Sequence, residues 1–353
     1  MPRPLSILVV NPGSTSTKMA LFEDQRQILA STLRHDAAQL RTYARIWDQE
    51  QFRLQAVREW AFANARDIVA VVTIGGLLRP VPGGTYRVNE RMIEDARANL
   101  QGEHASNLGC AMAHILSREY SCEAYVVDPV SVDELEPLAR YSGHPTIERS
   151  SLSHALNIHA AARRAAEELR LEPDKASFVI AHLGGGISVA PVRGGRIIDV
   201  NDASSDGPFS PERTGGLPLQ QFISLCFSGS LSEREVRAFV RGKGGLMAYL
   251  GTNSAPEIEQ RIDQGDQRAR EVFEAMAYQI AKEIGAMTTA LEGRIQAIVL
   301  TGGLASSARL TGWISHRVQF LAPILLYPGE EEMTSLALGV LRVLRGEAEA
   351  LEY

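Results

Sequence analysis

Two stretches of this sequence, residues 7–28 and 178–198, carry the same succession of three β-prone runs joined by two tight turns. The turns read N-P-G-S-T-S-T and E-D-Q in the first stretch, and H-L-G-G-G and R-G-G in the second. An internal repeat restricts the fold strongly because each copy must form the same supersecondary unit. The pattern favours a duplicated fold whose halves each open with a β-meander. Chance similarity between two such units is the alternative.

Apolar, β-prone runs alternate with longer helical patterns along the rest of the chain, which is typical of an α/β protein. The predicted strands are residues 6–10, 68–72, 124–127, 178–181, 297–300 and 324–326. The predicted helices are 153–170 and 334–345, begun by capping Ser153 and Thr334, and a pair in 257–294 that is broken near Gly265. Ser232 and Glu235 have the spacing of a capping box.

The composition is that of a protein with two ordinary domains, since 353 residues with 45% apolar content supply a core for each. A net charge of -6 without a basic tract argues against nucleic acid and anionic membranes as partners. The apolar run before Asn11 is too short for a signal segment or a membrane span, so we expect a cytoplasmic protein. Cys110, Cys122 and Cys226 lack C-x-x-C spacing and are predicted to be small core residues.

Three glycine- or hydroxyl-rich turns follow predicted strands and are candidates for binding phosphate. In residues 11–18 small residues let the backbone approach an anion, hydroxyls can donate hydrogen bonds, and Lys18 brings positive charge. Residues 182–186 contain three successive glycines, which are easiest to explain where a backbone must come close to a ligand. Gly302 and Gly303 form the third turn. Neither a P-loop nor a G-x-G-x-x-G fingerprint is present, so a dinucleotide site is not expected.

Over essentially its whole length, the chain resembles the butyrate kinases of the acetate kinase superfamily. The motifs that carry the resemblance, in the order of that family, are NPGSTSTK, GGLLRPVPGGTYRVNERM, GEHASNLG, VDPVSVDEL, HLGGGISV, GPFSPERTGGLP, FSGSLSEREV, GKGGLMAYLGTN, EAMAYQIAKEIGAM, IVLTGGLASS and YPGEEEM. The resemblance implies a duplicated actin-like, ribonuclease H-like fold with two domains around an interdomain nucleotide cleft. It implies an N-terminal acyl and phosphate domain, 1–150, joined by a C-terminal helix within 333–353, and a nucleotide-binding domain, 151–332.

The same resemblance implies a role for individual residues. The catalytic group is Asn11, Ser16, Lys18, His154 and Arg213. The groups that contact phosphate or adenosine are Ser14, His182, Gly184, Gly185, Gly186, Gly302 and Gly303. Asp128 and Glu331 match the carboxylates that hold Mg²⁺ and its waters, and the neighbouring Glu330 and Glu332 leave the register of the second open by one residue. The expected ligands are therefore ATP, Mg²⁺ and a small carboxylic acid, and we expect a homo-oligomer, dimeric or larger.

Two positions near the expected acid site depart from the family pattern. Ile74 stands where the family usually has an arginine that binds the substrate carboxylate, and Arg79 is a possible substitute. Ser153 stands where the family often has a phenylalanine. Together with Gly76, Ser153 is expected to leave a roomy acyl pocket.

These features predict a kinase that phosphorylates butyrate or a branched short-chain acid reversibly with ATP. Two alternatives are a kinase of a longer or bulkier acid and a catalytically weakened nucleotide-binding sensor or scaffold on the same fold.

Overall fold

The computed structural model describes residues 3–329 and 331–353, which form two compact units. Unit 1 comprises the described residues up to Asp133 together with Glu331–Tyr353, and unit 2 the described part of Glu134–Glu330. The boundary expected near residue 150 therefore falls inside unit 2. The reason is that residues 134–150 bond to the segment of unit 2 that follows β9: the Glu136 amide donates to the Ile198 carbonyl (2.9 Å) and the Arg149 guanidinium to the Val200 carbonyl (3.0 Å).

Unit 1 contains one six-stranded sheet with the strand order β3-β2-β1-β4-β6-β5. Its strands are β1 (Ser6–Pro12), β2 (Ser16–Glu23), β3 (Arg26–Arg34), β4 (Ile68–Thr73), β5 (Thr85–Arg87) and β6 (Glu123–Val127). Its helices are α1 (Ala37–Leu40), α2 (Glu50–Asn64), α3 (Glu90–Ala98), α4 (Leu108–Tyr120) and α12 (Glu332–Leu344), with short 3-10 turns η1 (Ile46–Gln49) and η2 (Ala105–Asn107).

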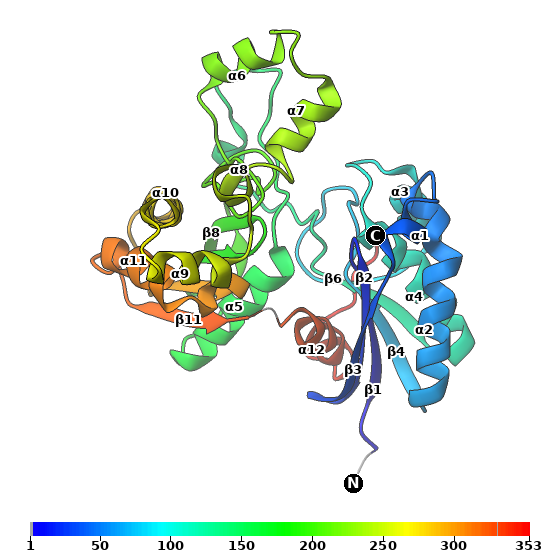
Figure 1. Ribbon diagram of the computed structural model, residues 1–353. Helices are drawn as coiled ribbons and strands as arrows, with labels where there is room; N and C mark the ends of the chain where they lie inside the picture. The colour runs from blue at the N-terminus through cyan, green and yellow to red at the C-terminus, as the bar shows by residue number, and fades with distance from the viewer. Residues whose placement is uncertain (1–2, 330) are drawn as a thin grey trace. The chain divides into compact units, whose positions relative to one another are not determined.

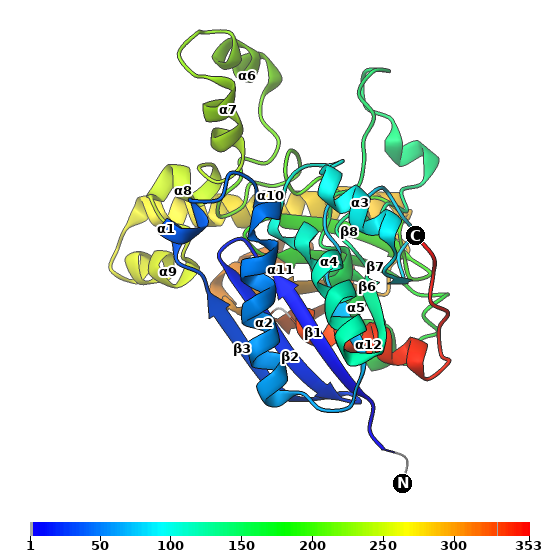
Figure 2. The ribbon, with the colours of Figure 1, turned by 90° about the vertical axis from the view of Figure 1, so that its right-hand side faces the viewer.

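Helices cover both faces of this sheet. Figures 1 and 2 show α2 and α4 side by side on one face and α12 on the other. Fully buried side chains fill the layer under α2 and α4, among them Leu8, Val10, Leu54 and Met112. The last helix thus completes unit 1, although it is separated from the other elements of the unit by the whole of unit 2 in the sequence.

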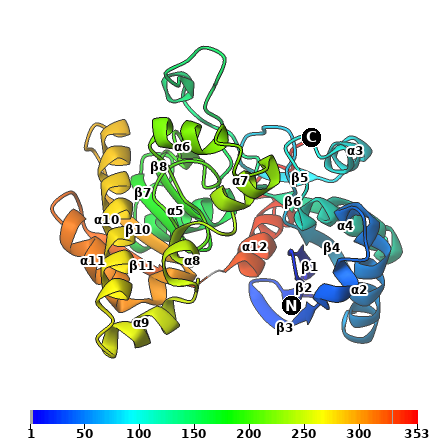
Figure 3. The same cartoon turned by 45° about the horizontal axis from the view of Figure 1, so that its top comes forward.

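Unit 2 contains a five-stranded sheet with the order β11-β10-β7-β8-β9. Its strands are β7 (Ser177–Leu183), β8 (Ile187–Arg193), β9 (Arg196–Ile197), β10 (Ala297–Gly302) and β11 (Ile324–Pro328). Its helices are α5 (Ala155–Glu168), α6 (Leu219–Cys226), α7 (Glu233–Val240), α8 (Gly245–Leu250), α9 (Ala255–Asp263), α10 (Gln267–Ala290) and α11 (Ala308–Val318), with 3-10 turns η3 (Pro137–Arg140) and η4 (Gly303–Ser306). Figure 3 shows α9, α10 and α11 grouped together, and Figure 2 shows α6 and α7 projecting from the rest of the unit.

The two sheets share one topology. In unit 1, β1 pairs antiparallel with β2 and β2 with β3, whereas β1–β4 and β4–β6 are parallel. In unit 2, β7–β8 and β8–β9 are antiparallel, whereas β7–β10 and β10–β11 are parallel. Each unit therefore repeats a meander followed by two parallel strands. This order confirms the duplication predicted from the two repeated stretches and excludes chance similarity.

Most of the predicted elements are confirmed, including all six predicted strands and the capping box at Ser232 and Glu235. The break near Gly265 is confirmed as well, since this glycine has φ +93° between α9 and α10. The two predicted caps are wrong. The N-cap of α5 is His154, one residue after Ser153, and α12 begins at Glu332, before Thr334.

The cysteine prediction holds for two of the three residues. Cys110 is fully buried and burial raises the pKa of its thiol to about 12, while half-buried Cys122 packs against the core under α4. Cys226 lies on α6, a helix with no buried residue, so it is not a core residue. Within the part of the chain that the structure describes, no helix is long and apolar enough to cross a membrane.

Candidate active site

The carboxyl ends of three parallel strands bring the expected residues of unit 1 to one edge of its sheet. β1, β4 and β6 run parallel, so Asn11 near the end of β1, Ile74 directly after β4 and Asp128 directly after β6 lie along this edge. Ligands of α/β proteins bind at such edges because loops rather than strands provide the surface there. The sheet therefore gathers residues that are far apart in the sequence.

Asn11 and Lys18 face each other across β1 and β2 and share a carboxylate partner. The Asn11 amide donates to Oε2 of Glu332 (2.9 Å), and Nζ of Lys18 lies 3.7 Å from the same oxygen. The side chain of Lys18 remains 42% exposed, so it is accessible to an anion. Glu332 was expected only as a sequence neighbour of the metal ligand Glu331. In the structure its carboxylate contacts both Asn11 and Lys18.

Glu331 lies one residue earlier, where it is the N-cap residue of α12 and its carbonyl accepts from the Ser335 amide (2.8 Å). Glu330 is outside the described residues. The sequence left open which of these glutamates binds the metal. Among the described residues the choice is between Glu331, the N-cap of α12, and Glu332, which contacts two expected catalytic side chains.

Asp128 is held in an unusual backbone conformation. Its φ is +40°, a left-handed value that is uncommon for residues other than glycine. The carboxylate Oδ1 accepts from the Gly84 amide (2.8 Å), and the side chain is almost fully buried. This geometry fixes the carboxylate at the end of β6.

Two hydroxyl-bearing residues of the turn of residues 13–17 are exposed. Ser14 and Thr15 are exposed, and the Ser14 hydroxyl lies 3.4 Å from Nε2 of His104. His104 and the buried Arg53 were not among the expected site residues. The guanidinium of Arg53 donates to the Gly13 carbonyl (2.8 Å) from beneath the turn. The neighbouring residues in the sequence gave no indication of either contact.

Gly76 does not leave open space at the acid site. A Cβ atom there would come within 2.5 Å of Cα of Asn107, so the glycine is required by the close approach of this backbone. Oδ1 of Asn107 accepts from the Leu77 amide (2.9 Å), and its Nδ2 donates to Oδ1 of Asn99 (3.0 Å) and to the Gly102 carbonyl (3.1 Å). The expectation that Gly76 enlarges an acyl pocket is therefore wrong.

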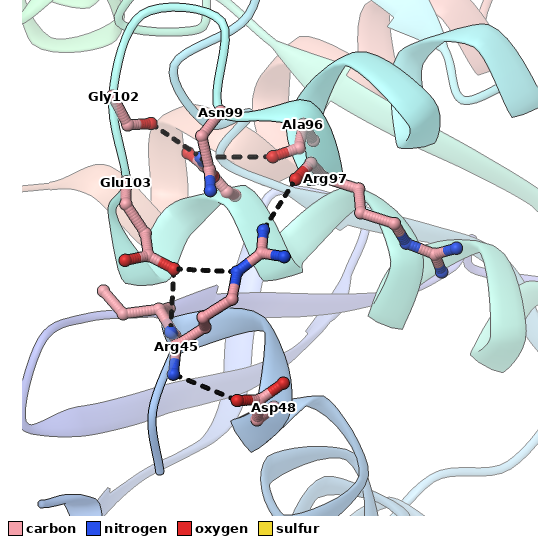
Figure 4. A network of polar contacts seen from close by, with 9 residues as sticks. Arg45, Asp48, Ala96, Arg97, Asn99, Gly102 and Glu103 are labelled. Carbon is pink, nitrogen blue, oxygen red and sulfur yellow. Dashed lines mark hydrogen bonds and ion pairs between the residues drawn. The ribbon is translucent and has the colours of Figure 1, made fainter.

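Polar contacts of Arg97 and Glu103 also tie the segment that precedes Asn107 to Arg45 and η1 (Figure 4). Arg45 donates to the Arg97 carbonyl (3.3 Å), and its guanidinium lies 4.0 Å from Glu103, whose carboxylate accepts from the Ile46 amide (2.9 Å). The Arg45 amide donates to Asp48 (3.0 Å). The turn that follows β4 is thus supported by a connected polar network.

Arg79 is already engaged by a carboxylate. Its guanidinium makes a two-point contact with Asp95, which also accepts from the Tyr353 hydroxyl (3.0 Å). The hydrogen bond to Asp95 raises the pKa of Arg79 above its usual range. Because this contact occupies one edge of the guanidinium, Arg79 is poorly placed to replace the missing arginine at Ile74.

In unit 2 the two expected histidines lie against each other. The rings of His154 and His182 stack with centroids 4.3 Å apart, and Nδ1 of His154 lies 2.9 Å from the Ser188 hydroxyl. Burial, followed by the neighbouring His182 and Arg213, lowers the pKa of His154 well below its usual range, and burial lowers the pKa of His182 to about 4. Both rings are neutral at pH 7, so they act as hydrogen-bonding groups and not as cations.

Ser188 holds His154 at two points. Its hydroxyl accepts from the His154 amide (3.4 Å) and lies 2.9 Å from Nδ1 of the ring. A neutral imidazole has one donor and one acceptor nitrogen. Ser188 therefore fixes the orientation of the ring.

Arg213 lies across the glycine turn that follows β7. Its Nη1 donates to the Ala203 carbonyl (2.6 Å), and a Cβ on Gly186 would come within 2.5 Å of its Cζ. Burial lowers the pKa of Arg213 to about 10, so it remains a cation at pH 7. Gly186 is thus a glycine because a guanidinium crosses directly over it.

The other turn glycines differ in what surrounds them. Beside Gly185 and Gly303 a Cβ would meet nothing within 4 Å, whereas at Gly302, with φ +93°, it would come within 2.5 Å of the Leu183 carbonyl oxygen. The Gly184 amide donates to the Gly186 carbonyl (3.1 Å), which closes the turn. Open space beside Gly185 and Gly303, next to the tightly packed Gly302, is compatible with a nucleotide that binds against backbone.

Ser153, the second departure from the family pattern, is buried next to His154 at 3% exposure. Its hydroxyl has no hydrogen-bond partner among the described residues. A small polar side chain therefore stands where the family often has an aromatic ring.

The acidic residues of unit 1 suit a hard cation such as Mg²⁺. Asp128 and Glu332 offer carboxylate oxygens, the ligand type that this ion prefers, and Asp128 is held rigidly. No cluster of three or more potential ligand residues occurs in residues 3–329 and 331–353. Mg²⁺ usually keeps several waters and binds through one or two carboxylates plus phosphate oxygens, so the donor set fits a metal that arrives with a nucleotide.

Comparison with known proteins places the chain in a family. Residues 147–319 match the acetokinase family. A probable butyrate kinase 2 of Caldanaerobacter subterraneus subsp. tengcongensis is 50% identical over 344 residues, 97% of this chain and 97% of that protein. This chain belongs to the acetokinase family. Butyrate kinase 2 of Clostridium acetobutylicum, 47% identical over 352 residues that cover 98% and 99% of the two chains, supports the same membership.

Solved structures agree with the fold of the acetokinase family. An acetate kinase of Porphyromonas gingivalis superposes with a TM-score of 0.76 at 18% identity, covering 94% of this chain and 98% of that chain. A propionate kinase of Francisella tularensis also gives a TM-score of 0.76 at 18% identity, covering 95% and 98%. At this identity the likeness confirms the duplicated α/β fold and carries no statement about substrate.

Proposed function

We propose that this chain is a kinase of short-chain carboxylic acids that transfers the γ-phosphoryl group of ATP to butyrate or a branched acid of similar length. The observation that carries the proposal is its 47–50% identity, over nearly the full length, to proteins named butyrate kinase or probable butyrate kinase. The polar groups described above supply the chemistry that such a reaction needs. The cytoplasmic location and the homo-oligomer stay predictions.

The reaction requires the protein to supply positive charge and to position the reactants, and it requires little proton transfer. A carboxylate nucleophile is ionised at pH 7, since its reference pKa is about 4, so no strong base is needed. An oxygen of the acid attacks the γ-phosphorus as the bond to the ADP oxygen breaks, which gives an acyl phosphate and ADP. Both ATP and the acyl phosphate are energy-rich, so the step is readily reversible.

Each residue has a specific task in this proposal. Lys18 and Arg213 place positive charge at the phosphoryl oxygens, and His154 donates a hydrogen bond from its neutral ring. Asp128 and Glu332, or Glu331 in the alternative register, would hold Mg²⁺. When bound, this ion neutralises charge on the phosphate chain and orients it.

The glycine turns are proposed to bind the nucleotide. Gly184–186 and His182 are assigned to the phosphates, and Gly302 and Gly303 to the adenosine. Asn11, Ser14 and Ser16 are assigned to the transferring group and the acid.

An acyl hydroxamate assay with MgATP and acetate, propionate, butyrate, isobutyrate and valerate tests the proposal. We expect turnover with acids of three to five carbons and a lower kcat/KM with acetate. Equal or better turnover of acetate would reverse the substrate assignment.

The second candidate, a nucleotide-binding sensor, is favoured by one observation, the isoleucine at position 74 in place of an arginine. It predicts that the protein binds MgATP and releases no ADP with any of the five acids. Measurable turnover with any acid would exclude it.

A further inference from the structure

The buried arginine beneath the first glycine- and hydroxyl-rich turn has no assigned role. Arg53 lies on α2, and its side chain is completely buried (0% exposed). Charged side chains are almost never fully buried without an opposite charge. Within the described part of the chain no ion pair involves Arg53, and its other partners are the side chains of Gln49 (2.9 and 3.0 Å) and Thr17 (3.3 Å). Its acceptors are therefore uncharged.

The main partners of Arg53 are the backbone carbonyls of the turn. Its guanidinium donates to the carbonyl oxygens of Gly13 (2.8 Å), Ser14 (3.1 Å) and Ser16 (3.1 Å). The fourth carbonyl of the turn, that of Thr15, accepts from the His35 amide (2.9 Å). All four consecutive carbonyl oxygens are thus bonded from the protein side.

This arrangement decides what the turn presents to a ligand. A carbonyl oxygen repels a phosphate, whereas amide N–H and hydroxyl groups attract it. With its carbonyls bonded inward, the turn leaves the hydroxyls of Ser14 and Thr15 exposed. A planar guanidinium can bond several acceptors at fixed angles, which the ammonium group of a lysine cannot do.

The charge of Arg53 acts in the same direction as its hydrogen bonds. Burial lowers the pKa of Arg53 to about 10, so the group remains a cation at neutral pH. Burial, and then the positive charge of Arg53, lowers the pKa of the nearby His35, whose Nε2 lies 2.9 Å from the Thr17 hydroxyl. A positive charge in a poorly hydrated position favours an anion bound on the other side of the turn.

We propose that Arg53 is a positioning residue for phosphoryl transfer, which holds the carbonyls of residues 13–16 away from the phosphate chain and adds a fixed positive charge behind it. The inference rests on the proposed kinase function, because it takes the turn to be a phosphate site. A purely structural role, in which Arg53 only ties α2 to the sheet, makes different predictions.

The test compares Arg53→Met and Arg53→Lys with Arg58→Met, a control that removes another arginine of α2, one paired with Glu119 (2.9 Å) at the surface. Acyl hydroxamate formation is measured under saturating MgATP and acid, normalised to the folded fraction from circular dichroism. We expect kcat to fall about 100-fold or more in Arg53→Met. We expect kcat to fall about tenfold in Arg53→Lys, which keeps the positive charge and loses the planar group that can bond several carbonyls at once. KM for the acid and the kcat of Arg58→Met should stay within threefold of wild type.

A structural role would instead lower Tm and leave kcat per folded molecule near the wild-type value, which would overturn the inference. If Arg53→Met does not fold, Arg53→Lys decides by itself, since a fall in kcat of less than threefold also overturns it. Failure of the proposed function is a separate result, because it appears as a wild-type protein that binds MgATP and turns over none of the acids.

Discussion

Replacing Gly186 with alanine should displace Arg213 without unfolding unit 2. The new Cβ would come within 2.5 Å of Cζ of Arg213, closer than non-bonded atoms approach. The atoms that it meets are at the far end of a flexible side chain, and the φ of Gly186 is not in the left-handed region, so the guanidinium moves and the backbone stays. The hydrogen bond from Arg213 to the Ala203 carbonyl is then lost.

The size of the effect follows from what Arg213 does in the proposed reaction. Removing one preorganised donor from the charge that develops in a transition state typically costs about 100- to 1,000-fold in kcat, or roughly 3–4 kcal/mol. We expect a kcat loss of this order in Gly186→Ala, with Tm changed by no more than a few degrees. Steady-state acyl hydroxamate kinetics and thermal unfolding measure the two quantities.

A double-mutant cycle with Arg213→Ala shows whether the loss of kcat in Gly186→Ala is caused by displacement of Arg213. Gly186→Ala should add little in that background, because the displaced group is already absent. Gly285→Ala, in the interior of α10 with nothing within 4 Å of the new Cβ, is a matched control that should leave kcat unchanged. Full activity of Gly186→Ala, or additive losses in the double variant, would refute the reasoning.

Three further predictions concern the metal, the histidines and the acid. Asp128→Asn should raise the Mg²⁺ concentration for half-maximal activity and lower kcat by about 100-fold, because an amide is a far weaker ligand than a carboxylate; ordinary magnesium activation would remove Asp128 from the site. His182 binds its proton with a pKa of about 4 when folded and about 6.5 when unfolded, so the unfolded state binds more protons between these values. The free energy of unfolding should therefore fall by roughly 3 kcal/mol from this residue as pH drops from 6.5 to 4, and urea unfolding of wild type and His182→Gln would show the difference. Ile74→Arg should raise kcat/KM for the acid about 10- to 100-fold, whereas Arg79→Met should lower Tm with little effect on KM for the acid, because Arg79 is held by Asp95. A large rise in that KM for Arg79→Met would show that Arg79 binds the acid.

Local patterns in the sequence were sufficient for the six predicted strands, for the helices within 153–170, 257–294 and 334–345, and for the duplication. The predicted strands at 68–72 and 297–300 each lie between two parallel partners in the interior of a sheet, where continuous apolar runs are a strong indication. The glycine turns after β7 and β10 were also recognisable, since glycine is required where backbone approaches backbone or a ligand. The cap of α5 was not recognisable, because its N-cap residue, His154, makes no side-chain hydrogen bond to the helix, whereas capping signals in a sequence rest on such a bond.

The contacts that make up the candidate site were decided by the tertiary structure. Arg53 reaches the Gly13 carbonyl over forty positions of sequence, and Glu332 reaches Asn11 from the other end of the chain. Burial set the neutral state of His154, and the same physical cause acts on Arg53. The sequence by itself determined which residue types were available and which strands and turns would carry them. Only folding determined their partners and charge states, because hydrogen bonding and desolvation depend on what lies nearby in space and not along the chain.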